Sequence, residues 1–277
     1  MFARILNLPN MLLFLSIFSL STAGYAQAEI SDTTKAIEEI KVMSYNIHHA
    51  SPPSQPDAID IDAIVRVIKA QDADLVALQE VDSGTERSGE GNQAAMIAER
   101  LNMYYYFSKA INFNGGEYGN AILSKYPIEE GSTHRLPNEP EAATEDRVMS
   151  TGKIRLPGGN EIIFASTHLD YKENSPSRVR QMKKLLEILI AMDQPVILAG
   201  DFNDVPDSET IKLLESAFQL TCSNCPPTFP VTEPVKAIDF IAYKHPQQKF
   251  RTKAHKVIDE TYASDHRSVF AVIELLK

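Results

Sequence analysis

The chain has 277 residues, 43% of them hydrophobic, and a formal net charge of −10 at pH 7. An acidic chain lacks the overall attraction to phosphate that broad, sequence-independent binding of nucleic acid requires, so that class of function is disfavoured. Acidic residues in this number suit a protein that gathers carboxylates around divalent cations. The length allows one large domain with a full hydrophobic core.

The N-terminus has the layout of a secretory signal peptide. Arg4 supplies a positive charge, the apolar run MLLFLSIFSLSTAG follows, and residues 26–28 form an A-x-A cleavage site. The apolar run is shorter than the roughly 20 residues of a membrane span, although an uncleaved anchor is the alternative. We therefore expect a signal peptide over 1–28, a polar lead-in over 29–38 and one domain over 39–277. The mature protein is expected to be exported, periplasmic or extracellular, with no integral membrane span.

Strands and helices are predicted to alternate through the first part of this domain. The apolar runs KVMSYNI (41–47) and LVALQEV (75–81) predict strands, and AIVRVIKA between them predicts a helix. NQAAMIAERL predicts a second helix, because its apolar residues repeat with the spacing of one helical face. Turn signals then separate four β-rich runs, which are YYYFSKAI, NAILSK, MSTGKIRL and EIIFASTHL.

The clearest helix follows over 177–192, where four apolar residues between Met182 and Leu189 form one stripe. The remaining elements are the strand PVILAGDFN, a helix from Ser208, and the strands AIDFIAY, FRTKAHKVI and SVFAVIEL. Two groups of strands flanked by helices predict an α/β fold. We expect a four-layer α/β sandwich, in which helices flank two packed mixed β-sheets.

Polar side chains stand at or beside the ends of these apolar strands. They are Asn46, Glu80, His168, Asp201, Asn203, Asp239, Asp265 and His266. Taken singly, most have an ordinary explanation as a solvated strand end or a hydrogen-bonded packing residue. Asp239 is different because Ile238 and Phe240 flank it, and an ionised carboxylate on a buried strand is costly unless it is paired. His266 is the available imidazole.

These residue types suit the metal-dependent hydrolysis of a phosphoester. Glu80 can serve as a carboxylate ligand of Mg²⁺, and Asp201 can orient or deprotonate the attacking water. An imidazole held by a carboxylate, His266 with Asp239, has a fixed tautomer and a raised pKa. Hydrogen bonds to the phosphoryl oxygens, where charge spreads in the transition state, can come from Asn46, His168 and Asn203.

A series of motifs in chain order resembles the endonuclease/exonuclease/phosphatase (DNase I-like) superfamily, which includes nucleases, neutral sphingomyelinases and inositol-polyphosphate 5-phosphatases. The motifs are MSYNI, LQEV, YGNAILSK, THLD, GDFN, IDFI and SDHRSV. The resemblance covers about residues 39–276 and implies a secreted hydrolase that uses Mg²⁺, with Mn²⁺ as a substitute.

By the same resemblance, Glu80 is the magnesium ligand, and Asn46 and Asp265 complete the metal shell largely through water. Asp201 is similar to the residue that positions the nucleophile, and Asn203 to its phosphate-binding neighbour. The resemblance gives the remaining roles as follows: His168 stabilises the phosphoryl group, Asp239 and His266 form a carboxylate–imidazole dyad, and Arg147 lies near the site.

Several weaker candidates are open to two interpretations. Tyr118 and Asn120 follow two glycines and could touch substrate from a loop at the mouth of the site, or belong to a hairpin turn. An arginine beside two acidic residues more often forms a surface ion pair, which is the alternative for Arg147. Asp170, in THLD, is a further candidate for binding substrate.

Cys222 and Cys225 are the two cysteines of the chain. A lone C-x-x-C can be half of a zinc site, a redox pair or a small disulfide. In an exported protein we expect a local disulfide that closes a surface loop.

The sequence says less about the substrate. Basic residues do not cluster near the predicted site, since Arg180, Lys183 and Lys184 lie on the polar face of a predicted helix. This favours a small, lipid-derived or sugar phosphoester as the partner, and no protein partner is predicted. A secreted nuclease acting on DNA or RNA is the alternative. A non-catalytic binding module of the same fold is a third reading, which the complete set of site residues disfavours.

Overall fold

The computed structural model describes residues 36–140, 144–173, 175–244 and 249–277. The expected signal peptide over 1–28 and the first part of the expected lead-in lie outside the described residues. Among the described residues, no helix combines the length and the apolar character needed to cross a membrane.

One six-stranded sheet is built from both ends of the domain. Its strands are β1 (Ala36–Asn46), β2 (Leu75–Ser83), β3 (Tyr104–Phe113), β4 (Gly116–Ser124), β11 (Phe250–Val257) and β12 (Val269–Leu276). They lie in the order β11-β12-β1-β2-β4-β3. β1 and β2 are parallel, with Asn46 opposite Gln79, so the residues at their C-terminal ends meet at one edge of the sheet.

The other six-stranded sheet comes from the middle of the chain. Its strands are β5 (Ile128–Leu136), β6 (Arg147–Arg155), β7 (Glu161–His168), β8 (Val196–Asp201), β9 (Phe218–Leu220) and β10 (Asp239–Lys244). They lie in the order β5-β6-β7-β8-β10-β9. β7 and β8 are parallel with His168 opposite Asp201, and β10 is antiparallel to β8 with Asp239 opposite Asp201. Three predicted site residues are therefore neighbours across adjacent strands.

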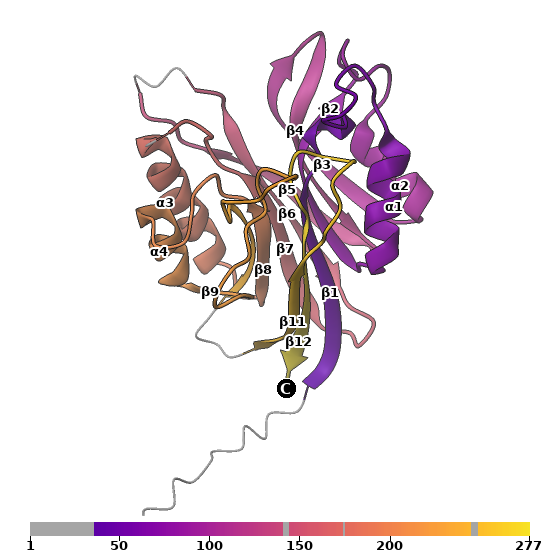
Figure 1. Cartoon of the computed structure of the whole chain (residues 1–277). Helices are drawn as coiled ribbons and strands as arrows, with labels where there is room; N and C mark the ends of the chain where they lie inside the picture. Colours follow the sequence, from indigo (N-terminus) through magenta and orange to yellow (C-terminus); the bar gives the residue numbers. More distant parts are fainter. Residues whose placement is uncertain (1–35, 141–143, 174, 245–248) are drawn as a thin grey trace, which may run out of the picture. The chain divides into compact units, whose positions relative to one another are not determined.

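The two sheets pack face to face and carry helices on their outer faces (Figure 1). Between them, a buried apolar cluster joins Leu75 and Ile122 of the first sheet to Phe164 and Ile197 of the second. A second cluster packs α1 (Ile61–Gln71) and α2 (Gln93–Leu101) against the first sheet. A third packs α3 (Pro176–Ile190) and α4 (Glu209–Glu215) against the second sheet. The expected four-layer α/β sandwich is confirmed.

Each of the α-helices α1 to α4 begins at a polar capping residue whose side chain accepts a backbone N–H. These residues are Asp60, Asn92, Ser175 and Ser208. Such caps satisfy amide donors that have no partner within the helix. The apolar stripe of α3 is buried against the second sheet, as expected, although the helix ends at Ile190 rather than at residue 192.

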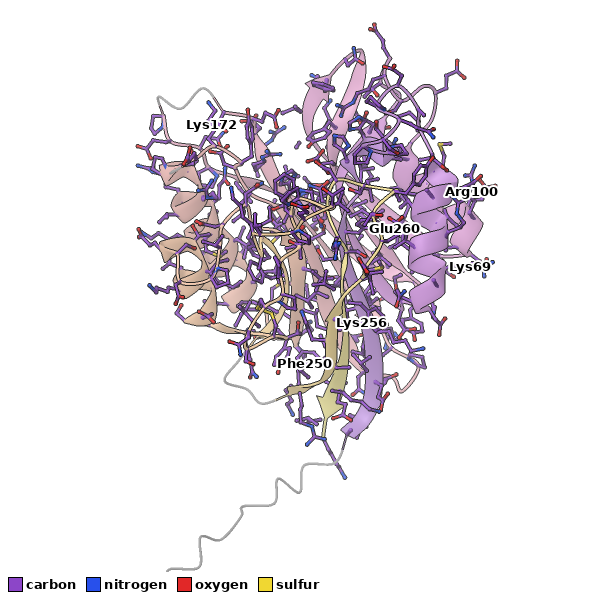
Figure 2. The ribbon with its side chains drawn as sticks, viewed as in Figure 1. Lys69, Arg100, Lys172, Phe250, Lys256 and Glu260 are labelled. Atoms are coloured by element: carbon purple, nitrogen blue, oxygen red, sulfur yellow. A yellow bond between two sulfur atoms is a disulfide. The ribbon has the colours of Figure 1, made fainter. Side chains whose placement is uncertain are left out.

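The structure extends the predicted elements in three places. β1 begins at Ala36, so the end of the expected 29–38 lead-in is strand, paired with β12. β5 was not predicted because its sequence, IEEGSTHRL, is polar and the strand lies at a sheet edge with little apolar patterning. The short edge strand β9 was not predicted either. In Figure 2, Lys172, in the segment between β7 and α3, and Phe250, at the start of β11, lie toward opposite ends of the sheets.

Candidate active site

The polar residues at the strand ends meet at one edge of the two sheets and surround a pocket of about 770 Å³. The predicted residues that line this pocket are Glu80, Tyr118, Arg147, His168, Asp201, Asn203, Asp265 and His266. Asn46 and Asp239 lie one hydrogen bond behind them, because Asn46 bonds Asp201 and Asp239 bonds His266. The core of the predicted set is thus gathered in one place.

Two of the pocket residues have a left-handed backbone conformation, which residues other than glycine rarely adopt. Glu80 has a φ of 58° and Asn203 a φ of 51°. The register of β2 against β4 shifts between Leu78 and Val81, so Glu80 lies in a β-bulge. Backbone strain of this kind costs about 1–3 kcal/mol at each residue and is concentrated at functional sites. Here it turns polar side chains of the strand ends toward the pocket.

Asp201 is the centre of the arrangement. Its Oδ2 accepts a hydrogen bond from Asn46 Nδ2 at 3.1 Å, and its Oδ1 accepts one from the Asn203 backbone N–H at 2.8 Å. The same Oδ2 lies 3.6 Å from His168 Nε2 and 3.8 Å from His266 Nε2. Burial, and then the charge of Asp239, raises the pKa of Asp201 to about 7. The carboxylate is therefore a base suited to neutral pH.

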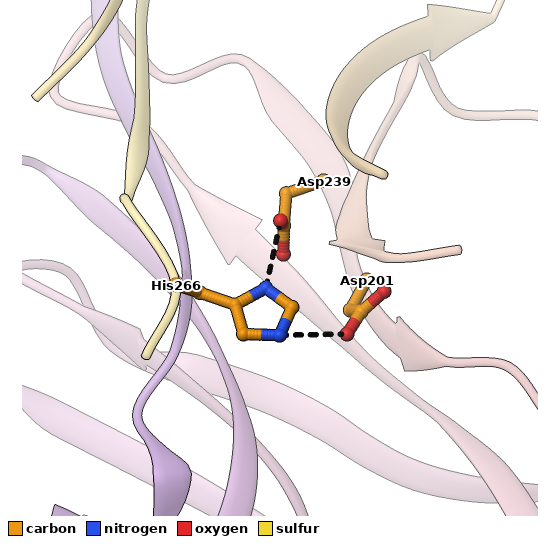
Figure 3. A group of neighbouring side chains, drawn as sticks. All are labelled: Asp201, Asp239 and His266. Atoms are coloured by element: carbon orange, nitrogen blue, oxygen red, sulfur yellow. Dashed lines mark hydrogen bonds and ion pairs between the residues drawn. The ribbon is translucent and has the colours of Figure 1, made fainter. Parts of the chain in front are cut away.

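His266 and Asp239 form the expected dyad (Figure 3). His266 Nδ1 donates to Asp239 Oδ2 at 2.9 Å, and both side chains are buried. Burial lowers the pKa of His266, but the charge and hydrogen bond of Asp239 outweigh it and raise the pKa to about 10. His266 is consequently an imidazolium at neutral pH, and its Nε2–H points toward Asp201 and the pocket.

His168, unlike His266, is not protonated. Burial, and then the charges of Arg147 and His266, holds the pKa of His168 well below its ordinary value, so the ring is neutral. Arg147 Nη1 lies 3.4 Å from His168 Nδ1, and a guanidinium only donates. His168 Nδ1 therefore accepts, which places the ring proton on Nε2, the nitrogen that faces Asp201.

Arg147 is buried in the pocket wall rather than on the surface, with only 3% of its side chain exposed. It still pairs with Glu145, at 3.3 Å. Its Nε has no hydrogen-bond partner among the described residues. The ion pair considered from the sequence is therefore present, but it is not on the surface. The guanidinium lies in the pocket wall, where it can meet an anion.

Asn46 links the two key carboxylates. Its Nδ2 donates to Glu80 Oε1 at 3.0 Å as well as to Asp201, and its Oδ1 accepts the His48 backbone N–H at 3.0 Å. That N–H is positioned by a turn over His48–Ala50 in which each residue has a positive φ. Asn46 therefore orients both carboxylates in this structure.

Glu80 and Asp265 have the donor chemistry of a divalent-metal site. Both are carboxylates that line the pocket, and oxygen donors are what Mg²⁺ and Mn²⁺ prefer. Burial, and in part the charge of Asp265, raises the pKa of Glu80. A divalent cation would relieve this unfavourable gathering of negative charge, so these residues suit a metal ion.

Besides Glu80 and Asp265, three buried side chains have potential ligand atoms within 4.8 Å of one another. They are Asp201, Asp239 and His266. A cation there would have to displace the hydrogen bond between His266 Nδ1 and Asp239, unless it used other atoms of the group. The hydrogen-bonded geometry suits proton transfer and charge stabilisation better than metal coordination.

The weaker candidates differ in position. Tyr118 lines the pocket from β4, just after the turn that joins β3 to β4, so the hairpin alternative is the one that the structure shows. Asn120 is buried and donates to the Val148 carbonyl oxygen at 2.9 Å. Asp170 is also buried and accepts hydrogen bonds from the hydroxyls of Thr144 and Ser175. Neither Asn120 nor Asp170 lines the pocket: Asn120 holds the backbone of β6, and Asp170 pairs with neighbouring hydroxyls.

Sequence reasoning missed an aromatic and basic rim around the pocket. Phe113 and Tyr171 line it and are 37% and 57% exposed. The Arg87 guanidinium lies 4.5 Å from the Phe113 ring centre, and that of Arg147 lies 5.9 Å from the Tyr171 ring centre. Arg87 is in turn held by two hydrogen bonds to Asp82. No local motif marks Arg87, Phe113 or Tyr171, because the fold alone brings them to the rim.

Cys222 and Cys225 are joined by a disulfide after β9. Both are partly buried against the apolar cluster of the second sheet, and neither lines the pocket. The paired sulfurs are not available as half of a zinc site.

Two mixed sheets with a carboxylate–imidazole pocket at their shared edge define a DNase I-like hydrolase fold. A family model described as "Endonuclease/Exonuclease/phosphatase family" matches residues 43–266. The chain belongs to this family.

Similar proteins cover most of the chain. YbhP of Escherichia coli K12 is 25% identical over 249 residues, which are 85% of this chain and 96% of that protein. The crystal structure of an endonuclease/exonuclease/phosphatase from Beutenbergia cavernae has a TM-score of 0.71 at 25% identity, covering 86% of this chain and 72% of that chain. A mannosyl-6-phosphatase of Bacteroides thetaiotaomicron has a TM-score of 0.67 at 20% identity, covering 84% and 99%. That last likeness shows a shared fold.

Proposed function

We propose that the protein is a divalent-metal-dependent phosphoesterase that hydrolyses a small, lipid-derived or sugar phosphoester by in-line attack of water. The observation that carries this proposal is the environment of Asp201. This buried carboxylate faces one neutral and one protonated imidazole, at 3.6 Å and 3.8 Å. The same pocket holds Glu80 and Asp265. Base, hydrogen-bond donors and metal-binding carboxylates are thus within reach of one phosphorus centre.

Each residue has a distinct task in the proposed reaction. Asp201 orients the attacking water and accepts its proton, for which a pKa of about 7 is well matched. His168 and His266 direct their Nε2–H groups at the phosphoryl oxygens, where negative charge spreads in the transition state. Asp239 keeps the His266 imidazolium charged and oriented. A Mg²⁺ or Mn²⁺ ion held by Glu80 and Asp265 would polarise a phosphoryl oxygen and stabilise the leaving oxygen.

The pocket supports a small substrate. Its volume of about 770 Å³ is within the range that encloses a whole small ligand. Its walls carry more acidic than basic side chains, which is unfavourable for a long polyanion such as DNA. Of the two arginines of α3, Arg178 lines the pocket and pairs with Asp204, whereas Arg180 is exposed and pairs with Glu139. A fold shared with a mannosyl-6-phosphatase agrees with a sugar phosphate as one candidate.

We propose in addition that the protein acts outside the cytoplasm, in the periplasm or the extracellular space. The N-terminal signal-peptide pattern supports this location. The Cys222–Cys225 disulfide supports it independently, because such bonds persist in oxidising compartments.

A substrate panel tests the proposed function. The mature protein with Mg²⁺ or Mn²⁺ is assayed against phosphorylated sugars, glycerophosphodiesters, sphingomyelin, a chromogenic phosphodiester and plasmid DNA. We expect faster turnover of a small ester than of DNA. Preferential cleavage of DNA would establish the nuclease alternative, and inactivity on every ester with either metal would favour a binding module.

A further inference from the structure

A buried hydroxyl outside the predicted site completes the hydrogen bonding of Asp239. Thr228 Oγ1 donates to Asp239 Oδ2 at 2.6 Å. Asp239 Oδ2 also accepts the His266 Nδ1–H at 2.9 Å. Asp239 Oδ1 is buried and has no hydrogen-bond partner among the described residues. A buried carboxylate is costly unless donors meet its charge. The Thr228 hydroxyl is therefore an important source of that stabilisation.

The direction of the Thr228 hydroxyl is fixed by its surroundings. Thr228 is fully buried, and its Oγ1 accepts the Ile238 backbone N–H at 3.3 Å. Because Oγ1 is the acceptor in that bond, its own proton is available for donation. Asp239 Oδ2 lies 2.6 Å from Oγ1 and is closer than the Lys236 carbonyl oxygen, at 3.4 Å. The shorter, charge-assisted bond to the carboxylate is the stronger of the two.

The backbone around Thr228 ties the two halves of the dyad together. The Thr228 N–H donates to the Lys236 carbonyl oxygen at 2.8 Å, close to the start of β10, where Asp239 lies. The Thr228 carbonyl oxygen accepts the Arg267 N–H at 2.8 Å, directly after His266. The next residue, Phe229, lines the pocket and places its ring 4.8 Å from the His266 ring. One short segment therefore contacts both dyad residues.

We propose that Thr228 is a positioning residue for the reaction and forms a Thr228–Asp239–His266 chain that aims His266 Nε2 at the phosphoryl group. Thr228 does not touch substrate; it fixes the carboxylate oxygen to which His266 donates. The proposal rests on the proposed function for its kinetic test, and on the geometry of the dyad for its spectroscopic test.

The kinetic test compares Thr228→Val, which has the same shape without the hydroxyl, with Thr228→Ser, which keeps it. On a chromogenic phosphodiester with Mg²⁺ we expect Thr228→Val to lower kcat by about 10–100-fold while KM changes less than about twofold. Thr228→Ser should stay within about threefold of wild-type kcat. Wild-type kcat in Thr228→Val would overturn the proposal.

Two further variants separate positioning from a general effect on folding. Thr210→Val removes a buried hydroxyl in α4 that lacks a hydrogen-bond partner among the described residues, and should leave kcat unchanged. In an Asp239→Ala background, Thr228→Val should cause no further loss of kcat, because its action passes through Asp239. If the two losses of kcat multiplied in the double variant, Thr228 would act independently of Asp239. This would contradict the proposed Thr228–Asp239–His266 chain.

A spectroscopic measurement keeps the proposal testable even if the phosphoesterase function is wrong. The low-field proton resonance of His266 Nδ1–H reports its hydrogen bond to Asp239 directly, at fixed pH and without substrate. We expect this resonance to shift or be lost in Thr228→Val and to be retained in Thr228→Ser and Thr210→Val. An unchanged resonance in Thr228→Val would overturn the positioning role, whereas an inactive wild type with the expected shifts would reject only the proposed function.

Discussion

At the residue scale, the burial that makes Asp201 a base suited to neutral pH also makes the folded protein less stable once Asp201 is ionised. Its pKa in the folded protein, about 7, lies above the ordinary value of 3.8. The folded state therefore holds this proton more tightly than the unfolded state. The associated stability is full below the ordinary value and is lost as the pH rises through about 7.

Asp201→Asn should separate the two effects. Because the amide cannot ionise, we expect the variant in EDTA to lose less thermal stability between pH 5 and pH 8 than the wild type loses. Its turnover with Mg²⁺ should fall by about 10²–10⁴-fold, the usual contribution of a general base. Thermal denaturation at the two pH values and steady-state kinetics measure this. A variant with wild-type turnover would remove Asp201 from the base role.

Glu80→Gln tests the metal site. Loss of the carboxylate charge should raise the Mg²⁺ concentration needed for half-maximal binding by about 10-fold or more, as measured by calorimetry. Glu173→Gln is the matched control, since Glu173 also lines the pocket but is not assigned to the metal. Equal losses of affinity in both variants would indicate a general charge effect instead of a ligand.

At the scale of single elements, the turn after β8 shows how backbone strain serves the site. Asn203 has a φ of 51°, its N–H bonds Asp201, and its Nδ2 donates to the Leu169 carbonyl oxygen at 3.0 Å. Asn203→Gly and Asn203→Ala both lose the side-chain bond, but only glycine adopts this φ without strain. We expect Asn203→Ala to be less stable than Asn203→Gly by about 1 kcal/mol in denaturant unfolding. Equal stability would show that the left-handed turn is not retained.

The elements also show what can be predicted from the sequence. The apolar patterns of LVALQEV and of α3 predicted a strand and a helix, and the GDFN and SDH motifs predicted which residues share a pocket. The bulge at Glu80 was not predictable, because it arises only from pairing with β4. Thr228 and Phe113 carry no local signal, since their positions depend on contacts across the fold.

At the scale of the whole molecule, metal binding and pH should act together on stability. Burial raises the pKa of both Glu80 and Asp201, so ionising them destabilises the protein that lacks metal. A divalent cation binds the ionised form and reverses this penalty. We expect Mg²⁺ to raise the melting temperature more at pH 8 than at pH 5. A shift that is equal at both pH values would mean that the ion binds elsewhere.

The central claim is that one pocket holds a divalent cation and a phosphoryl group side by side. Anomalous diffraction from crystals soaked with Mn²⁺ and inorganic phosphate tests it most directly. We predict a Mn²⁺ peak directly coordinated by carboxylate oxygens of Glu80 or Asp265, with phosphate oxygens against His168 and His266. A Mn²⁺ peak away from these carboxylates, or phosphate bound outside the pocket, would contradict the account.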